Sequence, residues 1–128
     1  IGIGSAPEFT TRLMWNKFPS KIKNEIKSKG KSLIKNGTYE YPISYQLIKD
    51  GRKNKVLCKT FLHQIQVSMF HGKKDEVVPI SFSKKVLSTF KKAKKKLFII
   101  KKGDHSLSDV KSLKKIKDEL SIMIKNII

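Results

Sequence analysis

The sequence lacks the features that mark secreted and membrane proteins. It has one cysteine, Cys58, so no internal disulfide can form, and no positively charged start followed by an apolar segment opens the chain. The longest uninterrupted apolar run, residues 97–100, is far shorter than the roughly 20 residues that a membrane-spanning helix needs. These absences argue against a membrane span and favour a cytoplasmic protein in a reducing compartment.

The chain is also short. Its 128 residues leave room for one domain and exclude a tandem of domains or a multidomain enzyme. With 38% apolar and 9% aromatic residues it has enough material for a core, and a chain of this size buries about two-thirds of its unfolded surface. The composition therefore predicts a globular fold rather than a disordered chain.

Acidic residues are scarce: 10 stand against 29 basic ones, which gives a formal charge of +19. Such a balance suggests nucleic acid or an anionic membrane surface as partner. However, Arg12 and Arg52 are the only arginines, whereas base and phosphate recognition favours guanidinium groups. The densest basic run, residues 91–96, has no interleaved aromatic side chains for base stacking, and such runs are usually solvated helix ends. A basic binding module for nucleic acid or anionic lipid is therefore the alternative function, not the favoured one.

The first half of the chain predicts a helical segment. Over residues 10–35, apolar residues recur at three- and four-residue steps, which indicates short helices. A turn is expected at Asn36-Gly37, and a further helix over residues 43–49 that ends at Gly51. Residues 9–56 are therefore predicted to form a helical insert.

The rest of the chain alternates between strands and helices. Short strands are expected at the start of the chain and over residues 65–70 and 97–100. One helix is expected from Ser81, and another from residue 108 to the end, where the apolar stripe is clearest. This order predicts an α/β fold with about three parallel strands and helices on the faces of the sheet.

Ionisable side chains follow two of these strands. Asp75 comes soon after the strand over residues 65–70, and His105 comes soon after the strand over residues 97–100. Because functional sites of parallel sheets lie at the carboxyl ends of the strands, the two side chains are expected to meet there. A carboxylate bonded to a histidine ring fixes its tautomer and makes the other ring nitrogen a working base. The alternative is that both residues only form turns.

Several segments resemble the α/β-hydrolase family. His71-Gly-Lys-Lys-Asp75-Glu-Val-Val-Pro79 looks like the acid loop of these enzymes, and Gly103-Asp-His105-Ser looks like their histidine loop. The opening Gly2-Ile-Gly-Ser-Ala-Pro-Glu-Phe-Thr10 and the later segment Tyr45-Gln-Leu-Ile-Lys-Asp-Gly-Arg52 are similar to a bacterial subgroup of serine hydrolases and to its mitochondrial acyl-protein thioesterase and acyl-glucuronide esterase relatives. The resemblance implies a small-molecule ester or thioester substrate, with Asp75 as the triad acid and His105 as the general base.

The same resemblance implies that residues 1–128 form only the carboxyl-terminal portion of a hydrolase domain. Residues 9–56 then correspond to the helical cap, and residues 57–128 to the sheet and helices that carry the acid and histidine loops. No Gly-x-Ser-x-Gly is present, and Ser5 lacks the turn and helix that follow such a serine, so Ser5 is not assigned as the nucleophile. The nucleophile is expected before Ile1, and the chain alone is expected to be inactive.

A partial fold predicts a partner. Its first strand would expose an unpaired edge and its apolar faces would lack covering helices, which favours association with a separate amino-terminal half of the same fold. A decayed remnant without a biochemical role would give the same sequence pattern.

No metal and no cofactor are expected, because the spacings of Cys58, His63 and His71 match no standard zinc pattern. Three apolar side chains of the insert have two alternative roles. They line an acyl pocket under the cap, as the resemblance implies, or they form the core of the cap. These side chains are Met14, Trp15 and Phe18.

Overall fold

The computed structural model describes residues 1–127 and divides the chain into two compact units. The sheet unit consists of Ile1–Pro7 and the segment from Leu57 onward, and the insert unit consists of Glu8–Val56. Residue 128, the end of the predicted closing helix and of the predicted sheet segment, lies outside the described residues. None of the described helices combines the length and the apolar character needed to cross a membrane.

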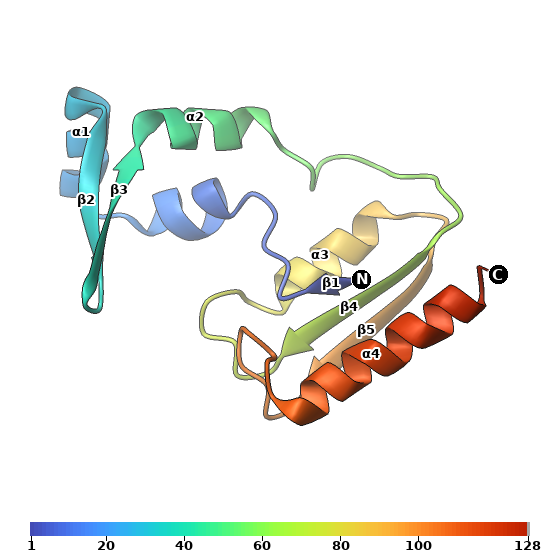
Figure 1. The fold of residues 1–128 in the computed structure, drawn as a ribbon. Helices are drawn as coiled ribbons and strands as arrows, with labels where there is room; N and C mark the ends of the chain where they lie inside the picture. Colours follow the sequence, from blue (N-terminus) through green and yellow to red (C-terminus); the bar gives the residue numbers. More distant parts are fainter. Residues whose placement is uncertain (128) are drawn as a thin grey trace. The chain divides into compact units, whose positions relative to one another are not determined.

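Three parallel strands form the centre of the sheet unit, in the order β1, β4, β5 (Figure 1). The strands are β1 Gly2–Ile3, β4 Gln66–Gly72 and β5 Lys94–Ile100. β4 lies between the other two and is buried over nearly its whole length, as expected for a central strand covered on both faces. The predicted α/β fold with about three parallel strands is confirmed.

Two helices cover opposite faces of this sheet. They are α3 Ser81–Thr89 and α4 Val110–Lys125. Successive side chains of a strand point to opposite faces, so Ser68 and His71 of β4 face different helices. The Ser68 hydroxyl donates to Glu119 of α4 over 2.7 Å, and His71 lies 2.7 Å from the hydroxyl of Ser83 on α3. Figure 1 accordingly shows α4 in front of the strands and α3 behind them.

Only part of the apolar stripe of α4 is buried by the other described residues. The helix turns Ser112, Glu119 and Met123 toward the sheet, and all three are buried. By contrast, Leu120 and Ile124 of the predicted stripe are 47% and 46% exposed. The closing helix is therefore where the sequence predicted it, but much of its apolar side lies at the surface.

The sequence predicted a helical insert over residues 9–56. The insert unit differs from this prediction because it contains a β-hairpin besides its helices. Its elements are a π-helical turn Thr10–Met14, a 3-10 turn Trp15–Lys17, α1 Ser20–Lys29, β2 Lys31–Asn36, β3 Tyr39–Ser44 and α2 Tyr45–Lys53. The helical prediction was wrong over β2 and β3, which pair antiparallel with Asn36 opposite Tyr39. Gly37 has φ +62° in the two-residue turn, a conformation that glycine adopts without strain.

The core of the insert unit decides between the two readings of its apolar residues. Trp15 is 7% exposed and packs with Ile26, Ile43 and Ile48, which are almost completely buried. The two other apolar side chains of that prediction, Met14 and Phe18, pack against the same cluster. These residues therefore form the core of the insert unit.

Candidate active site

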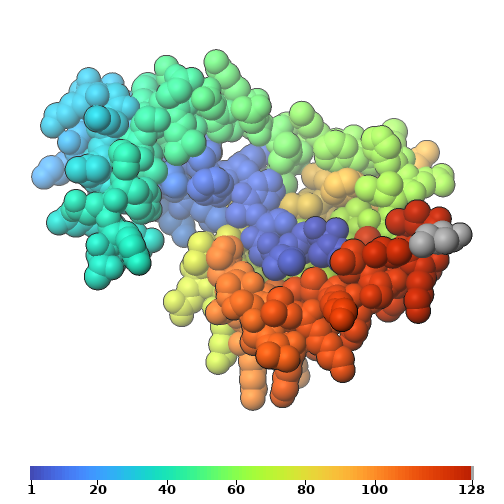
Figure 2. Space-filling model, in the orientation of Figure 1, coloured from blue at the N-terminus to red at the C-terminus, as the bar shows by residue number. Residues whose placement is uncertain are grey.

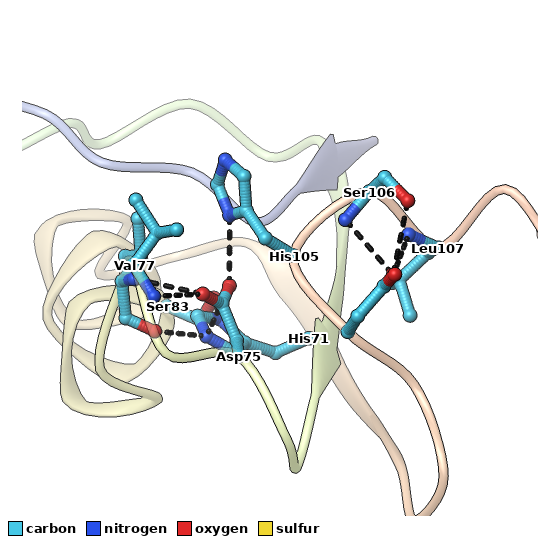
Figure 3. Close-up of polar contacts among 9 residues, drawn as sticks. His71, Asp75, Val77, Ser83, His105, Ser106 and Leu107 are labelled. Carbon is cyan, nitrogen blue, oxygen red and sulfur yellow. Dashed lines mark hydrogen bonds and ion pairs between the residues drawn. The ribbon is translucent and has the colours of Figure 1, made fainter. Parts of the chain in front are cut away.

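Asp75 and His105 meet beyond the carboxyl ends of β4 and β5 (Figure 3). Oδ2 of Asp75 lies 2.9 Å from Nδ1 of His105. Because a carboxylate accepts hydrogen bonds, Nδ1 of the ring carries the proton in this contact. The Asp75 side chain is completely buried, whereas that of His105 is 46% exposed. In Figure 3, the other nitrogen of the His105 ring points away from Asp75, which leaves it free to act as a base.

The second oxygen of Asp75 is held by the loop itself. Oδ1 accepts hydrogen bonds from the backbone N–H groups of Val77, at 2.9 Å, and Val78, at 2.8 Å. Burial raises the pKa of Asp75, but the hydrogen bonds from Val78, His105 and Val77 outweigh it and hold this pKa below its ordinary value. The buried carboxyl group is therefore an ionised and firmly oriented partner for His105.

The acid loop and the histidine loop are tied together through their backbones. The N–H of Lys73 donates to the carbonyl of Ile100 over 2.9 Å, and the N–H of Lys74 donates to the carbonyl of Gly103 over 2.9 Å. A Cβ atom at Gly72 would lie 2.2 Å from the carbonyl oxygen of Asp104, closer than any real Cβ contact. The absence of a side chain at Gly72 is thus required for this approach.

Asp104 shapes the histidine loop rather than joining the pair. Its Oδ1 accepts hydrogen bonds from the N–H and hydroxyl of Ser106 and from the N–H of Leu107, each at 3.0 Å. These bonds, led by the one from Leu107, lower the pKa of Asp104. Leu107 is fully buried at φ +48° and anchors the loop on the sheet unit. His105 is therefore presented by a loop that is fixed on both sides of it.

Gly4, just beyond β1, lies against the histidine ring. Its N–H donates to the carbonyl of Phe70 over 2.9 Å, and its φ is +50°. A Cβ atom here would come within 3.3 Å of Nδ1 and Cε1 of His105. Glycine at this position thus lets the chain pass close to the ring.

The other residues singled out in the sequence lie elsewhere. Among residues 1–127, no serine hydroxyl is bonded to His105, Ser5 included, and no group of three metal-ligating side chains forms. Cys58 and His63 are exposed, whereas His71 is completely buried on β4. Nε2 of His71 lies 3.3 Å from Oδ2 of Asp75, a proximity that only the folded chain reveals.

Comparison with known proteins identifies the fold. No protein-family model matches the sequence, and the search of curated proteins gave no significant match. A proposed hydrolase from Agrobacterium vitis S4 has a similar structure, with a TM-score of 0.86 and 22% identity over 95% of this chain and 48% of that one. Alpha/beta hydrolase domain-containing protein 10 from mouse has a TM-score of 0.82 and 23% identity over 99% of this chain and 52% of that one.

The chain therefore has the α/β-hydrolase fold, as the resemblance of its loops predicted. It spans about half the length of each of these two proteins. The chain is thus similar to a portion of these folds, and this portion includes the Asp75–His105 pair.

Proposed function

We propose that this chain is the carboxyl-terminal half of a serine hydrolase that cleaves carboxylic esters or thioesters. The observation that carries the proposal is the 2.9 Å hydrogen bond between buried Asp75 and exposed His105. In this proposal His105 is the general base and Asp75 orients it, while an amino-terminal half provides the nucleophilic serine and the oxyanion hole. The chain alone is then inactive, because the covalent route needs that serine.

The proposed reaction follows from the free nitrogen of His105. Nε2 removes the proton from the serine hydroxyl as its oxygen attacks the acyl carbon, and the resulting imidazolium gives this proton to the departing alcohol or thiol. Water then attacks the acyl-enzyme, again losing a proton to Nε2, which returns it to the serine as the carboxylic acid leaves. Asp75 stays ionised and stabilises the imidazolium, in keeping with its lowered pKa.

The two free edges of the sheet support a missing partner at β1. β5 begins with Lys94, Lys95 and Lys96, all exposed, and lysines on an edge hinder pairing with another strand. β1 carries no charged residue; Ile3 within it and Ile1 just before it are 45% and 44% exposed. In the described part of the chain, only β4 pairs with β1. We therefore assign the open edge of β1 to a strand of the amino-terminal half.

The surface of α4 supports the same partner. Leu113, Leu120 and Ile124 lie on one side of the helix, since they are separated by two turns and one turn. They are 52%, 47% and 46% exposed, and Figure 2 shows α4 lying open at the surface. Apolar faces of this kind are normally covered. The similarity to folds about twice as long supports the amino-terminal half as the cover.

The proposal is tested by supplying that half. We would express the chain together with the segment encoded immediately upstream of Ile1 and assay p-nitrophenyl butyrate and an acyl thioester. Hydrolysis is expected only when both parts are present, and His105→Ala should lower kcat by about 10⁴-fold or more. His63→Ala is the control, because His63 is an exposed histidine away from the pair.

Two results would overturn the proposal. One is an upstream segment without Gly-x-Ser-x-Gly. The other is hydrolysis that survives in the His105→Ala variant.

The charge of +19 supports a second candidate, a basic binding module. Its distinguishing property is binding to nucleic acid or anionic vesicles that weakens steeply as salt is raised. The carboxyl-terminal half of a hydrolase should show no such salt-dependent binding.

A further inference from the structure

A buried histidine next to the pair has no part in the reaction above. His71 is 0% exposed, and both nitrogens of its ring have partners. Nδ1 lies 2.7 Å from the hydroxyl of Ser83, and Nε2 lies 2.8 Å from the carbonyl oxygen of Val78. Nε2 also lies 3.3 Å from Oδ2 of Asp75 (Figure 3). The ring is thus enclosed between β4, the acid loop and α3.

The partners of His71 define the tautomer of its neutral ring. A carbonyl oxygen only accepts hydrogen bonds, so Nε2 must carry a proton to bond Val78. Nδ1 then has no proton and accepts the hydroxyl hydrogen of Ser83. The Val78 carbonyl thus fixes the tautomer, and Ser83 complements it by donating to Nδ1, with Nε2 held 3.3 Å from the Asp75 carboxylate.

His71 can act on both oxygens of Asp75. Its Nε2 lies 3.3 Å from Oδ2, the atom that also receives the hydrogen bond of His105. Its bond to the Val78 carbonyl fixes a residue whose own N–H donates to Oδ1 over 2.8 Å. Buried, fully satisfied networks of this kind restrict the side chains within them to one arrangement.

We infer that His71 is a positioning residue for Asp75, and that Ser83 holds the His71 ring in place for this role through its hydrogen bond to Nδ1. Ser83, His71, Asp75 and His105 then form a continuous row from α3 to the exposed base. The inference rests on the proposed function, in which the orientation of Asp75 decides the orientation of His105.

The chain offers a matched pair of substitutions for the test. Ser83 and Ser68 are both buried, and each hydroxyl lies 2.7 Å from one side chain. Ser83 faces His71, whereas Ser68 donates to Glu119 on the opposite face of the sheet. Ser83→Ala and Ser68→Ala therefore remove the same group at similar burial, but only the first disturbs the row.

The readout is the tautomer of the His105 ring in the full chain. It is monitored by nitrogen-15 NMR at a pH where the ring is neutral. We expect one tautomer with a low-field Nδ1–H proton in the wild type and in Ser68→Ala. In Ser83→Ala this proton signal should weaken, because the His71 ring loses the hydrogen bond that holds its Nδ1 side. His71→Phe should lose the His105 signal, and His71→Gln, which keeps an N–H near the position of Nε2, should restore part of it.

The same variants are then measured in the enzyme complemented with its amino-terminal half. Ser83→Ala is expected to lower kcat by roughly 10- to 100-fold, because small misplacements of catalytic groups cost this much, with little change in KM. Ser68→Ala should keep the wild-type kcat.

Failure of this inference and failure of the proposed function give different results. The inference is overturned if folded Ser83→Ala and folded His71→Phe both have the His105 signal and kcat of the wild type. The proposed function fails if the complemented wild type has no hydrolase activity, a result that leaves the NMR comparison valid.

Discussion

Gly72 lies directly against the backbone of Asp104, which joins the acid loop to the histidine loop. A Cβ atom at Gly72 would meet the carbonyl oxygens of Asp104 and Gly103 at 2.2 and 2.4 Å. The same two loops are joined by two hydrogen bonds, from the N–H of Lys73 to the carbonyl of Ile100 and from the N–H of Lys74 to the carbonyl of Gly103. The distance between Asp75 and His105 therefore depends on a glycine that is not part of the pair.

Gly72→Ala is predicted to separate the pair. The added methyl group must push the histidine loop away, at a cost of about 1–3 kcal/mol in the free energy of unfolding. Gly37→Ala is the control: nothing lies within 4 Å of its Cβ position, and only its φ of +62° is strained, for about 1–2 kcal/mol. Denaturant unfolding gives both costs. A Gly72→Ala variant that keeps the Asp75–His105 hydrogen bond, seen by NMR, would contradict the prediction.

Asp75→Asn is predicted to destabilise the chain in a pH-dependent way. The pKa of Asp75 is lowered in the folded chain, so ionised Asp75 adds stability above the pKa of the unfolded carboxyl and loses it as pH falls through the folded pKa. The difference in unfolding free energy between wild type and variant should therefore be largest at about pH 6 and shrink below about pH 4. Denaturant titrations over this range measure it, and a difference that does not change with pH would disprove it.

Two adjacent residues of α4 are predicted to respond differently to truncation. Met123 is 9% exposed against the sheet, whereas Ile124 is 46% exposed. Met123→Ala should cost about 2–5 kcal/mol, and Ile124→Ala should stay within about 0.5 kcal/mol. Ile124→Lys should in addition weaken binding of the amino-terminal half, measured by co-purification. Equal costs for the two alanine variants would show that α4 packs by another face.

Trp15→Ala is predicted to unfold much of the insert unit. The indole ring packs on Ile26, Ile43 and Ile48, and losing a buried aromatic side chain costs about 3–5 kcal/mol. Tyr39→Ala, at 78% exposure on the hairpin, is the control and should change stability little. Loss of the hairpin and helix signals by NMR checks the prediction, which fails if both variants are equally stable.

The sheet and the pair could be predicted from the sequence, because local signals and a general rule agreed. The apolar run at residues 97–100 and the strand before His71 were followed by polar loops, and parallel strands end at a common edge. That rule, together with the resemblance of the two loops to those of α/β-hydrolases, brought Asp75 and His105 together, and the structure gives the contact.

The hairpin was missed although its turn was seen. Leu33 and Ile34 are adjacent apolar residues, which fitted a helical step, yet Leu33 is 62% exposed and Ile34 faces the core of the insert unit. The Asn36-Gly37 dipeptide followed by the alternating Tyr39 and Tyr41 was the available hairpin signal.

Other features had no local signal. Gly51 was predicted to end its helix, but α2 runs through it to Lys53. The position needs glycine for another reason: a Cβ atom there would lie 2.0 Å from the Thr10 hydroxyl. The roles of Gly51 and His71 depend on neighbours far away in the sequence, as does the exposure of the α4 stripe. Pattern and propensity do not contain such information.

The most direct test of the central claim is nitrogen-15 NMR of the His105 ring in the intact chain and in Asp75→Asn. The account predicts a single neutral tautomer with the proton on Nδ1 and Nε2 unprotonated, and it predicts that Asp75→Asn loses this state. A ring protonated on Nε2, or a ring indifferent to the loss of the carboxylate, would contradict it.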